Sequence, residues 1–200
     1  MPSIGSASTT GGFTDCVLQR GAAAVTAVDV GYGQLHERVA GDPRVRVVDR
    51  TNIRTLTLDL IGEPVDLVVA DLSFISLTLV VEPLLRVCRP AADLIVLVKP
   101  QFEAGKQEAS RGKGVITSPD VWRRVLTEVI AAFVVGGATI MGLMVSPLTG
   151  ADGNVEFLLH AVAPAEGFVA APAAATSHAL PAGVDAMVDA AIADARPAEG

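Results

Sequence analysis

The sequence predicts an α/β domain with a mostly parallel sheet, and three observations lead to this prediction. Short apolar runs such as VDLVVAD and DLIVLVKP alternate with helix-like stretches, an order typical of βαβ units with right-handed crossovers. The runs are continuously apolar, so both faces of the strands are expected to be covered. Half of the 200 residues are hydrophobic but only 4% are aromatic, which favours an aliphatic core.

The expected elements follow one another through residues 1–163, which we predict to be one domain. Strands are expected at residues 24–29, 45–48, 66–71, 93–99, 138–145 and 155–162, and helices at 14–20, 34–39, 78–88 and 119–134. Only residues 2–5 remain for a strand ahead of the first glycine pair, so the first strand is expected to be incomplete. Residues 164–200 form an Ala- and Pro-rich tail that reads as a linker, in which residues 184–195 favour a short helix.

Two segments depart from this rhythm. Residues 101–117 show no periodicity and are rich in Gly, Lys, Arg and Glu, which is typical of a functional loop or lid. Residues 129–151 carry no charge and are long enough to cross a bilayer, but Gly136-Gly137 divides them. We therefore expect a helix end and a strand there, and no membrane span.

Composition limits the classes of function. The formal net charge is −7, whereas nucleic-acid binders are usually basic, so any RNA binding must depend on a local patch or another module. Cys16 and Cys88 are far apart and, like the three histidines, lack metal-ligand spacing; we predict no metal site. The first ten residues lack the features of a secretory signal, and free cysteines suit a cytoplasmic protein.

A glycine pair and an acidic residue suggest a nucleotide site. Gly11-Gly12, followed by Phe13, stands directly ahead of a predicted helix, where backbone N–H groups can meet a ligand, although such a pair is also ordinary turn chemistry. Asp29 ends the predicted strand at 24–29, the position at which a carboxylate accepts hydrogen bonds from ribose hydroxyls. Asn52, in the polar segment after the next strand, is placed either to meet the adenine end of a nucleotide or simply to form a loop.

The strongest signal is a set of three residues far apart in the sequence. Asp71 ends one predicted strand, Lys99 ends the next, and Glu156 begins the last. Parallel strands place Asp71 and Lys99 at the same edge, and an antiparallel last strand would bring Glu156 there too. Such a cluster can hold a lysine in place and adjust its protonation, and a neutral lysine can take a proton from a hydroxyl. The alternative is a structural salt bridge.

Six segments together resemble the TlyA family: GGFTDCVLQRGA, AVDVGYGQL, DRTNIR, DLSFISL, VKPQFEAG and GNVEFLL. Members of this family are ribosomal RNA 2'-O-ribose methyltransferases that use S-adenosylmethionine, and some have been called hemolysins. The resemblance covers about residues 10–159. It implies a Rossmann-like methyltransferase fold of the FtsJ type, with seven strands of which the last is antiparallel.

The resemblance also implies a chemistry. Family members use a Lys-Asp-Lys-Glu tetrad to deprotonate a ribose 2'-hydroxyl, usually of cytidine, and its last three members match Asp71, Lys99 and Glu156. Lys99 would be the main activator of the hydroxyl, and the two carboxylates would set its charge and orientation. The hydroxyl oxygen then attacks the sulfonium methyl group in line, so that positioning supplies much of the rate.

Binding residues follow from the same resemblance. S-adenosylmethionine would contact Gly11, Gly12, Phe13, Asp29, Asn52 and Asp71. Ribosomal RNA, or a ribosomal subunit, would contact the loop at 101–117 through Lys106, Arg111 and Lys113.

Three family features have no counterpart in this sequence: the S4-type RNA-binding domain, the first tetrad lysine, and the aspartate of the first glycine motif, which aligns with Gly5. These departures predict an N-terminally truncated chain. They leave open a second hypothesis, a catalytically impaired homologue that acts only as a binding module. A Rossmann oxidoreductase is weaker, because the glycine motif is not G-x-G-x-x-G, and a membrane-lytic role lacks a basic amphipathic segment.

Overall fold

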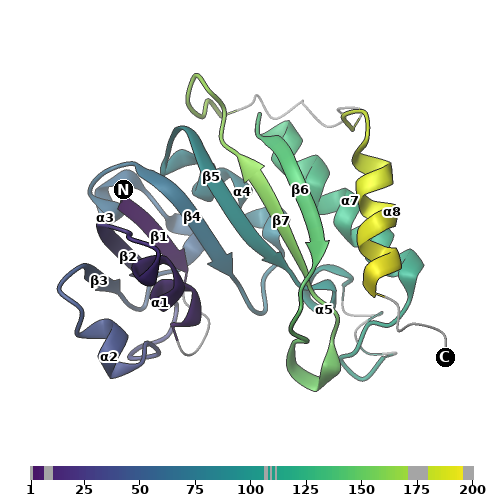
Figure 1. Ribbon diagram of the computed structural model, residues 1–200, viewed down its shortest axis with the longest axis horizontal. Helices are drawn as coiled ribbons and strands as arrows, with labels where there is room; N and C mark the ends of the chain where they lie inside the picture. The colour runs from purple at the N-terminus through teal and green to yellow at the C-terminus, as the bar shows by residue number, and fades with distance from the viewer. Residues whose placement is uncertain are drawn as a thin grey trace.

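The structure is a computed structural model that describes residues 2–6, 11–105, 108, 110, 112–170 and 180–195. Within these residues, seven strands form one sheet in the order β3-β2-β1-β4-β5-β7-β6 (Figure 1). Their bounds are β1 Pro2–Ser6, β2 Ala24–Val28, β3 Val45–Val48, β4 Val65–Asp71, β5 Cys88–Val98, β6 Thr139–Val145 and β7 Phe157–Val162. Strands β1 to β5 pair in parallel, whereas β7 is antiparallel to β5 and β6. The predicted sheet, with its antiparallel last strand, is confirmed.

The first strand lies inside the sheet, between β2 and β4, despite its shortness. The sequence offered only residues 2–5 for it, and the structure shows a strand of five residues, Pro2–Ser6, between β2 and β4. Both neighbours are parallel to it, so the order of strands reverses at β1. A crevice at such a reversal is the usual ligand site of an open parallel sheet.

Helices and short helical turns connect the strands. They are α1 Gly12–Gln19, α2 Glu37–Ala40, η1 Ile53–Thr55, α3 Leu58–Ile61, η2 Leu77–Leu79, α4 Val81–Arg86, α5 Pro100–Glu103, α7 Pro119–Val135, η3 Ala151–Gly153 and α8 Val184–Ala195. The helix predicted at 78–88 is divided into η2 and α4, and β5 begins five residues earlier than predicted. It does so because Cys88 already pairs with Val65, ahead of a register shift in the ladder.

Helix α7 supplies much of the core. Ser118 precedes it and Pro119 is its first residue, a position where the missing N–H of proline is harmless. Its buried residues recur at helical spacing: Trp122, Val125, Leu126, Val129, Ile130 and Phe133. The uncharged stretch from 129 to 151 is thus shared among α7, a glycine turn and β6. No helix in the described part of the chain is long and apolar enough to cross a membrane.

The tail contributes a helix to the fold. Helix α8 packs against β6 and α7 (Figure 1), with Val184, Val188, Ala191 and Ile192 buried. Its Asp189 forms an ion pair with Arg123 of α7. The helix predicted at 184–195 is therefore confirmed, but this part of the tail is packed on the domain and is not a linker. The division of the chain at residue 163 stays a prediction.

We predict that Ile192→Ala lowers the free energy of unfolding by about 2 kcal/mol, because it leaves a cavity between α8 and the sheet. Ile192 is only 3% exposed. Urea denaturation of the whole chain measures the effect. The control is Asp194→Ala, an exposed position on the same helix, where a change within about 0.5 kcal/mol is expected. Equal midpoints for the two variants would mean that α8 adds no stability.

Candidate active site

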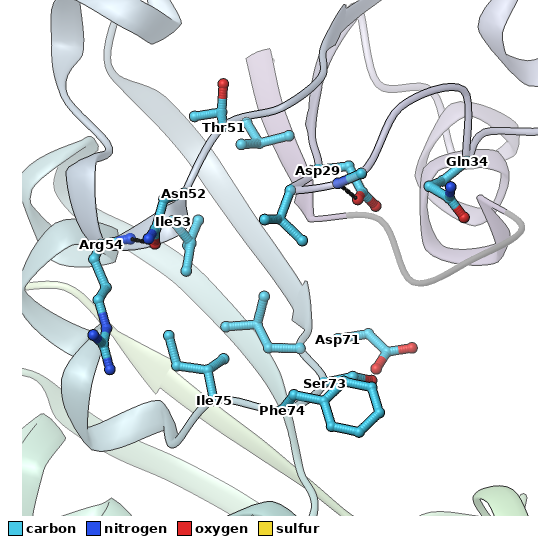
Figure 2. Close-up of a pocket in the computed structure, with 14 residues that line it drawn as sticks. Asp29, Gln34, Thr51, Asn52, Ile53, Arg54, Asp71, Ser73, Phe74 and Ile75 are labelled. Atoms are coloured by element: carbon cyan, nitrogen blue, oxygen red, sulfur yellow. Dashed lines mark hydrogen bonds between the residues drawn. The ribbon is translucent and has the colours of Figure 1, made fainter.

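A cavity of about 570 Å³ lies at the carboxyl ends of β2 and β4, where the strand order reverses (Figure 2). Its walls are formed by Val28, Asp29, Val30, Gly31, Gln34, Thr51, Asn52, Ile53, Arg54, Asp71, Leu72, Ser73, Phe74 and Ile75. The volume, and the mixture of apolar walls with a few polar groups, are typical of sites for small molecules and cofactors.

Asp29 is held at the cavity wall by the turn that follows β2. Its Oδ1 atom accepts a hydrogen bond of 2.6 Å from the backbone N–H of Gly31. A Cβ atom on Gly31 would lie 2.8 Å from Gln34 Cγ and 3.1 Å from this same oxygen, so any side chain at this position would crowd both Gln34 and the Asp29 carboxylate. Figure 2 shows the carboxylates of Asp29 and Asp71 on the same side of the cavity.

Asn52 reaches the cavity from the loop after β3. Its Oδ1 atom accepts a 3.0 Å hydrogen bond from the backbone N–H of Arg54 and so caps η1. The neighbouring Thr51 N–H donates to the backbone oxygen of Asp29 at 2.9 Å, which joins the ends of β2 and β3. The side chain of Arg54 points away from Asp29 and Asp71 (Figure 2). The predicted residues Asp29, Asn52 and Asp71 therefore share one cavity.

The glycine pair lies elsewhere in the described structure. Gly11, with a φ of 80°, precedes α1, and Gly12 is the first residue of that helix. Both line a second hollow, of about 600 Å³, whose other residues include Gln19 and His36. Phe13 is half-buried on α1. Neither Gly11, Gly12 nor Phe13 is among the described residues of the Asp29 cavity, so their role in cofactor binding stays a prediction.

Asp71 and Lys99 form a buried ion pair. The Nζ atom of Lys99 lies 2.5 Å from Asp71 Oδ1, and the two side chains are only 10% and 15% exposed. The same ammonium donates to the hydroxyl of Ser73 at 3.3 Å. A lysine buried among apolar strand ends needs a counter-charge, and the adjacent parallel strand provides it. The predicted meeting of Asp71 and Lys99 is confirmed.

Glu156 joins the same edge from the antiparallel strand. Val98 pairs with Phe157, so Lys99 and Glu156 are the next residues along their two strands. Glu156 is 6% exposed, and among the described side chains its hydrogen-bond partner is Gln101, whose Nε2 atom donates to Glu156 Oε1 at 3.0 Å. The edge therefore brings the three predicted residues together, with Gln101 as an additional member.

Ser73 and Phe74 are site residues that the sequence analysis did not single out. Phe74 is 89% exposed and has a φ of 62°, a strained conformation for a bulky residue that is often found at functional sites. Its ring lies 4.9 Å from that of Phe102, and Lys99 Nζ is 5.9 Å from the Phe102 ring. A signal was available in the sequence, since both residues lie within three positions of Asp71, the last residue of β4.

Asn154, close to Glu156, holds the C-terminal end of the loop at residues 101–117, which is predicted to contact RNA. Its side chain is buried and accepts from the Ile116 N–H at 3.1 Å, while its Nδ2 atom donates to the Gly114 oxygen at 2.9 Å. Lys113, next to this anchor, is exposed with a φ of 51°. The other two predicted RNA contacts, Lys106 and Arg111, lie outside the described residues.

The family model for the FtsJ-like methyltransferases matches residues 4–162 of this chain. The chain belongs to the FtsJ-like methyltransferase family. The resemblance and the Rossmann-like fold expected from the sequence are thereby confirmed. Among described residues, no group of three or more His, Cys, Asp or Glu side chains could hold a metal ion.

Individual proteins of known name or structure are similar to this chain over most of its length, and they are longer than the matched region. The chain is 49% identical over 152 residues to the Mycobacterium tuberculosis protein named 16S/23S rRNA (cytidine-2'-O)-methyltransferase TlyA, covering 76% of this chain and 56% of that protein. Hemolysin A of Brachyspira hyodysenteriae is 33% identical over 154 residues, with 76% and 64% coverage. A solved structure from Streptococcus thermophilus, described as a hemolysin, superposes with a TM-score of 0.81 at 34% identity, over 97% of this chain and 67% of that one. The chain thus spans a little more than half the length of the curated relatives it matches.

We predict that Lys99→Met lowers the free energy of unfolding by about 2 kcal/mol, because it leaves the Asp71 carboxylate buried without its counter-charge. Fully buried pairs lose roughly 3–5 kcal/mol, and the slight exposure of this pair lowers the expected loss. The double variant Lys99→Met with Asp71→Asn removes that charge and should recover at least half of the loss. Urea denaturation of all variants measures this coupling, and strictly additive effects of the two changes would contradict it.

Proposed function

We propose that this chain is the catalytic domain of an S-adenosylmethionine-dependent methyltransferase that acts on a ribose 2'-hydroxyl of ribosomal RNA, with cytidine as the target nucleoside. One observation carries the proposal: Asp71 both lines the cavity and pairs with Lys99 at 2.5 Å. A pocket for a cofactor and a buried basic side chain are thus two parts of one site. The relative's name supplies the nucleic acid and the nucleoside.

The cavity residues fit the implied cofactor. Asp29, fixed by the Gly31 N–H, would accept hydrogen bonds from the ribose hydroxyls of S-adenosylmethionine, as acidic residues after the second strand of such sheets do. Asn52 and the apolar Ile53 would meet its adenine ring. When bound, the cofactor supplies an electrophilic methyl group on a sulfonium centre.

The buried pair would activate the substrate hydroxyl. Once its ammonium has released a proton to solvent, the free amine of Lys99 would accept the proton of the ribose 2'-hydroxyl, which would leave the hydroxyl oxygen as the nucleophile. The ammonium that results is stabilised by Asp71 and oriented by Ser73. Glu156 would supply the second negative charge at the same edge. Because Lys99 lies between β5 and α5 and is paired with Asp71, little reorganisation would be needed to place its nitrogen at the moment of reaction.

Contacts with RNA would be local, because the chain as a whole is acidic. The exposed ring of Phe74 offers a surface on which a splayed-out base can stack. Lys106, Arg111 and Lys113 are proposed to contact phosphates, with Lys113 placed beside the anchor at Asn154. The curated relatives extend beyond the region matched here, and we propose that their additional chain contributes to RNA binding.

The direct test of this function is transfer of a radiolabelled methyl group to ribosomal subunits. Lys99→Met should lower the rate at least about 100-fold, since it removes the proton acceptor. Arg86→Ala, which removes an exposed cation paired with Glu82 on α4, is the control and should keep the wild-type rate. Equal labelling by wild type and Lys99→Met would refute the role of Lys99. Cofactor binding without any transfer by the wild type would favour the binding-module hypothesis.

Loss of the Asp29 carboxylate tests the cofactor site separately. Asp29→Ala should weaken the binding of S-adenosylmethionine about 10-fold or more, the effect of losing hydrogen bonds to a charged group. Isothermal titration calorimetry measures the dissociation constant. Asp59→Ala, at an exposed position of α3, is the matched control, and an Asp29→Ala affinity equal to that of the control would place the cofactor elsewhere.

A further inference from the structure

The short helix α5 lies between the two halves of the site. It comprises Pro100–Glu103 and directly follows Lys99, with the Phe102 N–H donating to the Lys99 oxygen and the Ala104 N–H to the Pro100 oxygen, both at 2.9 Å. Successive helical residues are rotated by about 100°, so Gln101 and Glu103 point in nearly opposite directions. One faces the start of β7 and the other faces the loop after β4.

On the β7 side, Gln101 holds Glu156. The Gln101 Nε2 atom donates to Glu156 Oε1 at 3.0 Å, while Gln101 Oε1 is buried and accepts no hydrogen bond in the described structure. A flipped amide would set two acceptors against each other, so the amide orientation is fixed. Gly150 closes the other side, because a Cβ atom there would lie 2.1 Å from the same Glu156 oxygen. The carboxylate is confined between an amide donor and a backbone without a side chain.

On the β4 side, Glu103 holds the end of the loop that begins at Asp71. Its Oε1 atom accepts from the Leu77 N–H at 2.7 Å, and its Oε2 atom accepts from the Ser76 hydroxyl at 2.5 Å. Burial raises the pKa of Glu103, and the bonds from Leu77 and Ser76 oppose that rise. Between these bonds and the Asp71 ion pair lie Ser73 and Phe74, so both ends of this loop are fastened.

We propose that Gln101 and Glu103 are positioning residues for methyl transfer, acting on opposite sides of Lys99. Gln101 holds Glu156, and Glu103 holds the 71–77 loop that carries Asp71. The inference rests on the proposed function, because positioning has meaning only if Lys99 takes part in the reaction. Neither Gln101 nor Glu103 lines the cofactor cavity, so Gln101 is expected to affect turnover without affecting cofactor affinity.

The test for Gln101 is a comparison of turnover and cofactor binding in the 200-residue chain. Gln101→Met keeps the length of the side chain and removes the donor, and it should lower kcat about 10-fold, in line with the cost of misplacing a catalytic group. The dissociation constant for S-adenosylmethionine should stay within about twofold. Glu82→Met, which also replaces a polar side chain by methionine but at an exposed position of α4, is the control and should leave both values unchanged.

The test for Glu103 uses rescue by the conservative variant. Glu103→Ala should lower kcat and speed hydrogen exchange at the Leu77 amide, whereas Glu103→Gln keeps an acceptor for that amide and should retain at least half of the rate with slow exchange. Glu82→Ala, at an exposed position on α4, is the matched control. If Glu103→Ala fails to fold, Glu103→Gln and Gln101→Met still decide the question.

These experiments distinguish failure of the positioning role of Gln101 and Glu103 from failure of the proposed methyl-transfer function. Wild-type turnover in Gln101→Met, or a Glu103→Gln variant as impaired as Glu103→Ala, would overturn the positioning role alone. A wild-type chain that binds the cofactor and transfers no methyl group would refute the proposed function and the inference with it.

Discussion

The ion pair between Asp71 and Lys99 is the constraint on which the site depends. Residues 67–70 of β4 and 94–98 of β5 are apolar, so Lys99, which directly follows β5, lies in an environment that does not solvate a charge. Parallel pairing solves this directly: Asp71 is in register with Leu97, and its carboxylate can reach the lysine two residues further on. The cavity and Lys99 are adjacent because the Asp71 carboxylate both lines the cavity and pairs with the lysine.

Much of the fold could be predicted because a buried parallel strand has a simple sequence pattern. The strand at 45–48 and the helix at 184–195 were located at their observed bounds, and the strands at 24–29, 66–71 and 138–145 to within one residue. The early start of β5 could not be predicted, since Cys88-Arg89-Pro90 has no strand pattern and pairs only because Val65 lies opposite. The packing of α8 on β6 and α7 could not be predicted either, because the sequence of an alanine-rich helix does not indicate which elements it contacts.

The charged residues of the site could be predicted from the sequence, whereas the residues that hydrogen-bond to them or to the neighbouring loop could not. Asp71, Lys99 and Glu156 could be found because each stands at the boundary of a strand, where topology alone sets its position. Gln101 and Asn154 act through contacts between residues 55 and 38 positions apart, and no spacing rule reports such contacts. Gly11 and Gly12 form a plausible nucleotide-binding motif in the sequence, but among the described residues they do not line the cavity that contains Asp29.

The short helix α5, which follows β5, limits how the length of the segment from Lys99 to Glu103 can change. Lys99, Gln101 and Glu103 serve three different neighbours from five consecutive positions, and each additional residue would rotate everything beyond it by about 100°. An insertion or deletion between Lys99 and Glu103 would therefore turn at least one of these side chains away from its partner. The number of residues between Lys99 and Glu103 is therefore fixed by the three contacts that they make.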